Sequence, residues 1–185
     1  PVDYSVQAGD TTKAVIYSFS GAMSPGKKES AYLHLPTYTA GILYHLGTFA
    51  SVAIFLLLLS GIILPGPVSV VLAAFFGLTL TAGLLVLIKR ITKSELRSLS
   101  NPDDYISNIL VTGTQVLTAL VLLNAAISAV YFLWVSLLLL YIPVGKLKHA
   151  IYFFAARYHL GYYFGYRDTW PEKGHNKLQP YDGRE

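Results

Sequence analysis

The sequence contains no cysteine and a single methionine, Met23. Without thiolates the chain cannot hold an iron–sulfur cluster by itself, because such clusters are bound through cysteine sulfur, and it cannot form a disulfide. Charge is also scarce, since Asp, Glu, Lys and Arg make up 13 % of the 185 residues, about half the usual share in a soluble domain. The sequence shows no catalytic triad, phosphate loop or metal-hydrolase motif. These absences argue against a self-contained soluble enzyme.

What the chain has instead is long apolar runs. Asp, Glu, Lys and Arg are missing from residues 50–63, 68–88, 109–123 and 129–144. A helix needs roughly 20 mainly apolar residues to cross the hydrocarbon of a bilayer. We therefore predict an all-α membrane protein, built as a four-helix transmembrane bundle. The expected spans are residues 37–64, 68–88, 105–124 and a fourth from about 129 to 150.

Turn signals support these boundaries. Pro65-Gly66-Pro67 predicts a tight turn between the first two spans. Residues 100–104, Ser-Asn-Pro-Asp-Asp, have the capping residue, early proline and acids typical of a helix start. A turn near 125–128 is expected on length alone. The fourth helix then passes Pro143 and Gly145, with a kink, and continues to Arg157.

Cationic residues all fall on one side of this four-span arrangement. Those nearest to the spans are Lys27, Lys28, Lys89, Arg90, Lys93, Arg97, Lys146, Lys148, Arg157 and Arg167. The opposite turns, 64–67 and 125–128, carry no charge. The positive-inside rule then predicts a multi-pass protein of the inner (cytoplasmic) membrane with both termini in the cytoplasm.

Three parts follow from this organisation. Residues 1–36 form a polar N-terminal arm in which no cleaved signal peptide is apparent. Residues 37–150 form the membrane domain. Residues 151–185 contain a tyrosine-rich segment, expected to be an amphipathic helix lying in the membrane interface, and a polar tail.

Two histidines lie in the membrane domain. His45 is in the first span, within Tyr-His-Leu-Gly, and His149 ends the sequence Pro-Val-Gly-Lys-Leu-Lys-His at the inner end of the last span. An imidazole in hydrocarbon is costly unless something binds it. Two imidazoles from different helices can ligate one haem iron. The alternative interpretation is that each histidine is an ordinary polar residue of the interface.

These contexts resemble the gamma subunit of respiratory nitrate reductase and related membrane cytochrome subunits of heterodisulfide reductase and quinone-interacting oxidoreductase complexes. The family's His-Leu-Gly is matched at residues 45–47, and its Pro-x-Ser-Arg-Leu-x-His at residues 143–149. The basic loop at 89–104 and the aromatic tail at 154–165 are similar as well. The match covers residues 30–171 and would correspond to the last four of the nitrate reductase subunit's five helices.

The resemblance implies haem b with His45 and His149 as the axial ligands of its iron. The family's second, outer pair of ligands would fall at Phe55 and Tyr131, and neither side chain suits a low-spin b haem. One haem in the cytoplasmic half is therefore the expectation. Gly47, close to His45, would leave room for a porphyrin face, although a glycine in a span is more often a packing residue.

Other residues have weaker claims to the site. Lys146, Lys148 and Arg157 are candidate partners for haem propionates, although cations commonly reach from a membrane boundary toward water. His34 and His159 are alternatives that could hold a second haem or lie at a quinone site. The last histidine, in the polar tail, is expected to be solvated.

The function implied is that of a membrane anchor, not catalytic alone, that passes electrons between quinone and a soluble iron–sulfur subunit. That subunit would dock on the basic cytoplasmic face, with the first 30 residues and the C-terminal tail as docking arms. The alternative is a haem-free structural anchor or assembly subunit of such a complex. A small transporter would need ionisable residues at span centres or interrupted helices, and the span centres have no ionisable residue.

Overall fold

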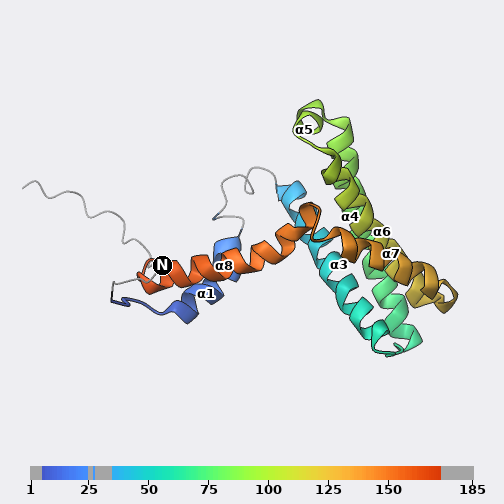
Figure 1. The fold of residues 1–185 in the computed structure, drawn as a ribbon, viewed down its shortest axis with the longest axis horizontal. Coiled ribbons are helices and arrows are strands. Elements are labelled where there is room, and N and C mark those ends of the chain that lie inside the picture. Colours follow the sequence, from blue (N-terminus) through green and yellow to red (C-terminus); the bar gives the residue numbers. More distant parts are fainter. Residues whose placement is uncertain (1–5, 25–26, 28–34, 172–185) are drawn as a thin grey trace, which may run out of the picture. The chain divides into compact units, whose positions relative to one another are not determined.

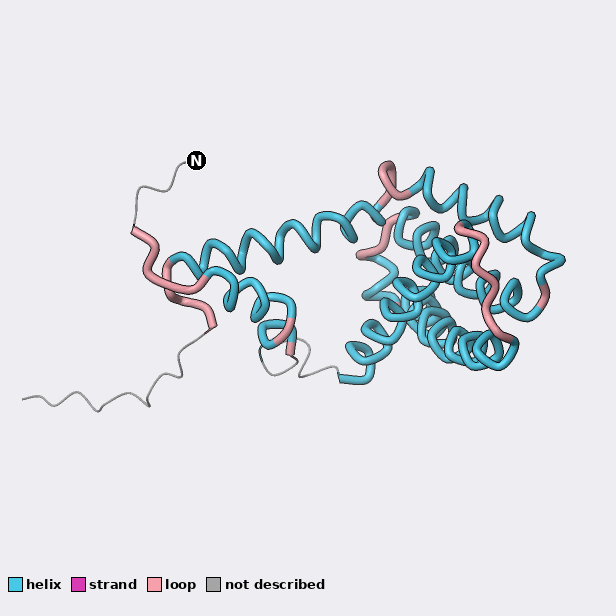
Figure 2. The backbone as a smooth tube through the Cα atoms, turned by 90° about the horizontal axis from the view of Figure 1, so that it is seen from below, coloured by secondary structure: helices cyan, strands magenta, loops and turns pink. Residues whose placement is uncertain are grey.

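The structure is a computed structural model that describes residues 6–24, 27 and 35–171. Two compact units make up the chain. The bundle unit is His34–Lys148, and the terminal unit combines Pro1–Leu33 with His149–Glu185. Within the described residues both units are built from helices and loops alone (Figures 1 and 2). This confirms the predicted all-α class.

Four long helices form the bundle unit (Figure 1). They are α3 (Leu35–Leu59), α4 (Gly66–Thr92), α6 (Pro102–Leu123) and α7 (Ser128–Tyr141). Short helices connect them: α5 (Ser94–Ser98), η3 (Ala125–Ile127) and η4 (Lys146–Lys148). Consecutive long helices run antiparallel, and α6 packs against α3, α4 and α7. Every charged residue of α3 to η4 lies at the end of the bundle where α4 finishes and α6 begins.

Three of these helices, α3, α4 and α6, are long and apolar enough to cross a membrane. A fourth crossing would require Ala125–Tyr141 and Lys146–Tyr166 to act together as one broken span. The chain is therefore a membrane protein with three or four candidate spans. The fourth helix was predicted to continue to Arg157 with a kink at Pro143 and Gly145, but the structure divides it: α7 ends at Tyr141 and α8 begins at His149, with a bend of 78° between them.

The first predicted turn is shifted. Helix α3 ends at Leu59, because Gly61 takes the left-handed conformation with φ of 74°. The N–H groups of Gly61 and Ile62 donate to the carbonyls of Leu58 and Leu57, at 3.0 and 3.1 Å, which is the Schellman pattern. The Pro-Gly-Pro segment begins α4 and does not end α3. Its second proline occupies the first helical turn, where its missing N–H costs nothing.

The predicted start of α6 is confirmed. Asn101 is the N-cap, and its side-chain oxygen accepts from the Asp104 N–H at 3.1 Å. The Asp104 carboxylate in turn accepts from the Asn101 N–H at 3.0 Å, which completes a capping box. The turn expected near 125–128 is also present, as η3, and the side chain of Asn124 caps it by accepting from the Ala126 N–H at 3.0 Å.

The terminal unit pairs two helices from opposite ends of the sequence, α1 (Thr11–Phe19) and α8 (His149–Tyr166). They run antiparallel: the Ala8 N–H donates to the Tyr166 carbonyl at 2.9 Å, and the Ser18 hydroxyl donates to the Arg157 carbonyl at 2.5 Å. The residues buried between them are small: Ala14, Ser18, Gly161 and Gly165. Small side chains let the two backbones approach closely.

Candidate cofactor site

The rotation of α3 is fixed by a buried amide. Gln115 on α6 is fully buried, and its NH₂ group donates to the Tyr44 carbonyl and to the Thr48 hydroxyl, both at 3.1 Å. Its carbonyl oxygen accepts from the Thr79 hydroxyl of α4 at 2.8 Å. One side chain therefore joins three helices. Because a buried amide is costly when it loses its partners, this network holds one face of α3 inward.

The Tyr44 side chain adds a second buried link between the same helices. Its hydroxyl lies 2.9 Å from the Thr112 hydroxyl and donates to the Asn108 carbonyl at 3.2 Å. The ring packs against Gly83 so closely that a Cβ there would overlap it. Tyr44 thus ties α3 to both α4 and α6 at this level of the bundle.

His45 consequently lies on the exposed side of α3. Tyr44 and Gly47, close to it in sequence, lie on the inner face, and each residue of a helix turns about 100° from the last. The imidazole stacks on Phe49, with ring centroids 6.5 Å apart and an interplanar angle of 28°. Gly41, one turn earlier, has open space where a side chain would stand. The exposed flank beside His45 therefore presents an aromatic ring and a glycine without a side chain.

Gly47 does not provide the space expected of it. A Cβ at this position would lie 2.5 Å from the Thr79 Cβ and 2.9 Å from the Gln115 side-chain oxygen. The glycine is needed for helix packing inside the bundle, and protein already fills the room beside it. The expectation that Gly47 accommodates a porphyrin face is wrong.

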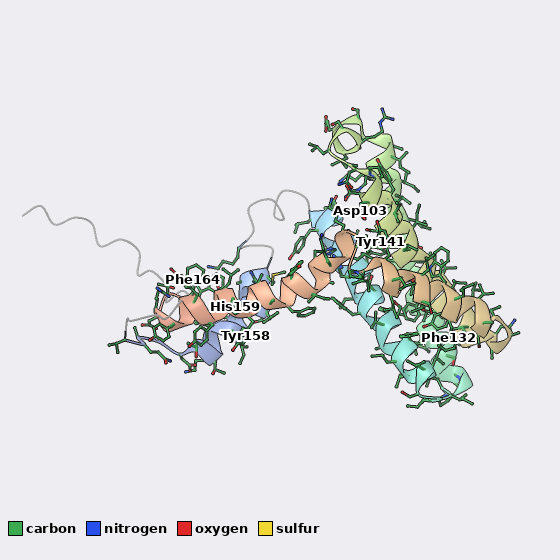
Figure 3. The ribbon with its side chains drawn as sticks, viewed as in Figure 1. Asp103, Phe132, Tyr141, Tyr158, His159 and Phe164 are labelled. Atoms are coloured by element: carbon green, nitrogen blue, oxygen red, sulfur yellow. The ribbon has the colours of Figure 1, made fainter. Side chains whose placement is uncertain are left out.

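An acidic pair at the start of α6 holds the chain that leads to His149. Asp104, whose side chain is 8 % exposed, accepts from the Lys146 ammonium at 2.6 Å and lies 3.3 Å from the Arg90 guanidinium. Asp103 accepts from the Tyr141 hydroxyl (Figure 3) and from Ser107 at 3.2 Å. We call Asp103, Asp104, Tyr141 and Lys146 the clamp. It fixes both sides of the break between α7 and η4.

These contacts bear on the candidate propionate partners. Lys146 is an ion-pair partner of Asp104, and the Arg157 guanidinium donates to the Ser18 carbonyl within the terminal unit. Lys148 is exposed at the end of η4. Two of the three cations therefore have structural partners within their own units.

His149 is the first residue of α8 and is exposed. It belongs to the terminal unit, whereas His45 belongs to the bundle unit, so the two candidate ligands come from different units. His159 is also exposed on α8, with its ring 5.6 Å from that of Tyr158 (Figure 3). His34 lies outside the described residues.

Phe55 and Tyr131, at the family's outer ligand positions, meet inside the bundle. Their ring centroids are 6.5 Å apart, and Tyr131 is fully buried. Phe132 packs against both rings, at 6.1 Å from Phe55 and 5.3 Å from Tyr131 (Figure 3). Hydrocarbon and aromatic side chains therefore fill this half of the bundle unit.

Within the described part of the chain, no three His, Asp or Glu side chains gather as a group that could hold a metal ion. No protein family, curated protein or solved structure matches the chain.

Two features of the site are not evident from the sequence. Gln115 is the one amide within the uncharged run 109–123, and such a residue usually has a hydrogen-bonding role because its burial is otherwise unfavourable. For Asp103 and Asp104 the sequence predicts only the role of helix-starting acids. Their links to Tyr141 and Lys146 depend on how the chain returns after α7.

The clamp gives a direct prediction. Asp104→Asn keeps an oxygen for the Asn101 cap but removes the charge that Arg90 and Lys146 share. We expect a loss of about 1–2 kcal/mol of stability, less than for a fully buried pair because both cations reach water. Thermal unfolding in detergent measures it, together with faster proteolysis within residues 142–148. Glu95→Gln, at an exposed acid of α5, is the matched control, and equal effects of the two variants would contradict the clamp.

Proposed function

We propose that the chain is a membrane-anchoring b-type cytochrome subunit, with His45 and His149 as the axial ligands of one haem. It would pass electrons between quinone in the membrane and a soluble iron–sulfur subunit. The observation that supports this proposal is that Tyr44, next to His45, and Lys146, three residues before His149, both bond to the first half of α6.

The attachment follows from two sets of contacts. Tyr44, next to His45, bonds at Asn108 and Thr112 of α6, whereas Lys146 bonds at Asp104. On α6, Asp104 lies one to two helical turns from Asn108 and Thr112, which is roughly 6–12 Å along the helix axis. His149 follows Lys148 directly, and one residue adds at most about 3.8 Å between Cα atoms. Each proposed ligand therefore lies within three residues of a side chain that bonds to α6.

The side chains around His45 suit a porphyrin. An imidazole nitrogen is the axial ligand of many haem proteins, and the exposed flank beside it offers the Phe49 ring and the open surface at Gly41. When bound, haem would supply a one-electron centre between quinone and a cluster chain. The protein would contribute the two imidazoles, an apolar surface and, at Lys148, a cation that could pair with a propionate.

The distribution of cationic residues indicates the face on which a soluble subunit would dock. Lys89, Arg90, Lys93 and Arg97 gather at the end of the bundle that also bears Lys146 and Lys148. Under the positive-inside rule this end faces the cytoplasm. An iron–sulfur subunit docked there would stand close to the haem, as one-electron transfer requires.

The test is an optical spectrum and a haem assay of the full-length chain purified in detergent from cells supplied with iron. The proposal expects one haem per chain, the α band of a low-spin b haem after reduction, and reduction of that haem by a quinol analogue. A chain that folds but carries no haem, even after addition of hemin, would instead be a haem-free anchor of such a complex.

A further inference from the structure

The terminal unit is packed in an unusual way for a protein surrounded by water. Its two helices touch through Ala14, Ser18, Gly161 and Gly165. A Cβ at Gly161 would lie 2.6 Å from the Val15 Cα, and one at Gly165 would lie 2.5 Å from the Ala14 Cβ. Burying such small residues removes little apolar area from water. Contact through small residues is the mode by which helices associate in lipid.

The large apolar side chains of the same unit face outward. On α1, Ile16 is 63 % exposed. The exposed residues of α8 are Ile151, Tyr152, Phe153, Phe154, Tyr158, Leu160, Tyr162 and Tyr163. At 3.6 residues per turn, Tyr152, Tyr158 and Leu160 point to three different sides of the helix. A helix that is apolar all round is normally covered by something other than water, and α1 covers one side only.

The chemistry of this surface fits the boundary between lipid headgroups and acyl chains. Tyrosine and tryptophan are enriched there because one end of each ring is apolar and the other polar. Trp170 extends the aromatic surface, packing on Phe164 at 4.7 Å and on Tyr17 at 5.6 Å. Lys13 is ion-paired with Asp10 at 3.6 Å, whereas Arg167 lies over the Tyr163 ring, 3.8 Å from its centroid, and a cation among such rings favours anionic headgroups. The surface is also continuous in sequence with the membrane helices, since α8 follows Lys148 directly.

We propose that α1 and α8 insert together, as an antiparallel hairpin, into the headgroup region of the bilayer, with lipid as the partner of their aromatic surface. This assigns α1 to the membrane and not to the docking of a soluble subunit. The proposal does not depend on haem.

The absence of cysteine allows a clean test with single spin labels. Labels would be attached at Ile16→Cys on α1 and Leu160→Cys on α8, both outward positions. Leu78→Cys, exposed on α4, reports the lipid, and Glu95→Cys on α5 reports water. The full chain is reconstituted in vesicles of phosphatidylcholine and phosphatidylglycerol. Electron paramagnetic resonance then measures collision with oxygen, which concentrates in lipid, and with a water-soluble nickel chelate.

The hairpin proposal expects the oxygen-to-nickel collision ratio at residues 16 and 160 to be several-fold above that at residue 95 and closer to that at residue 78. A ratio equal to that at residue 95 overturns it, because the surface is then in water. Low collision with both reagents also overturns it, because protein then covers the surface.

A second measurement uses the unsubstituted chain, so it does not depend on the labelled variants folding. A phosphatidylcholine carrying a photoactivatable group on its acyl chain is irradiated in the same vesicles, and the labelled peptides are identified by mass spectrometry. Adducts on both 11–19 and 149–166 support the hairpin. Adducts confined to the bundle unit refute it.

Discussion

We expect both His45→Ala and His149→Ala to lose haem if the two imidazoles are the axial ligands of one iron. A low-spin b haem needs both axial ligands, so removal of either should weaken haem binding by more than about 100-fold, beyond the usual effect of disturbing an outer-shell partner. Both histidines are exposed within their own units. Alanine is well tolerated in helices, so the variants should keep their fold while losing the cofactor.

Haem per chain, from the pyridine haemochrome assay, is the measurement, and circular dichroism checks the helices. His159→Ala is the matched control, since this histidine is also exposed on α8, and it should retain haem, as should His34→Ala. Free imidazole should restore part of the low-spin spectrum to His45→Gly. Haem loss in His159→Ala with retention in His149→Ala would assign the second ligand to the other histidine of α8.

The membrane helices were predictable because an uncharged apolar run of about 20 residues matches the thickness of a bilayer and is rare in soluble domains. The start of α6 was predictable because capping is local: Asn101, Pro102 and Asp104 satisfy one another within one turn. The end of α3 was missed for a related reason. Gly61 ends that helix through its own positive φ, whereas the nearby prolines, on which the prediction rested, belong to the next helix.

The break after α7 was less predictable, because its cause is not local. The sequence shows Pro143 and Gly145, which predict a kink within one helix. In the structure, the Tyr141 hydroxyl reaches Asp103 and the Lys146 ammonium reaches Asp104. These contacts fix both ends of the break, and no sequence period signals them.

The pairing of α1 with α8 was difficult to predict for a similar reason. Ala14 and Ser18 are four residues apart, as are Gly161 and Gly165, and this spacing is a known signal for close helix contact. The signal does not say which helix is the partner.

The orientation of the functional residues was also not predictable from the sequence alone. Sequence context selected His45, but the hydrogen-bond network of Gln115 determines that its imidazole faces outward.

Because of that network, we expect Gly47→Ala to destabilise the bundle unit strongly. The new methyl group would lie 2.5 Å from the Thr79 Cβ and 2.9 Å from the Gln115 oxygen. Either α3 moves away or the Thr79–Gln115 hydrogen bond breaks. Overpacking costs about 1–3 kcal/mol, an unsatisfied buried amide costs a further ~1–3 kcal/mol, and the better helix propensity of alanine offsets about 1 kcal/mol, so we expect a net loss of about 1–5 kcal/mol.

Gly41→Ala is the matched control, because it makes the same change on the same helix where nothing stands within 4 Å. Alanine is favoured over glycine in a helix by about 1 kcal/mol, so this variant should be slightly more stable. Thermal unfolding in detergent compares the two. If both variants unfold at the same temperature, the inner face of α3 is not the one that packs on Gln115. His45 would then no longer be fixed on the outer flank, so the same measurement tests the geometry of the proposed haem site without haem.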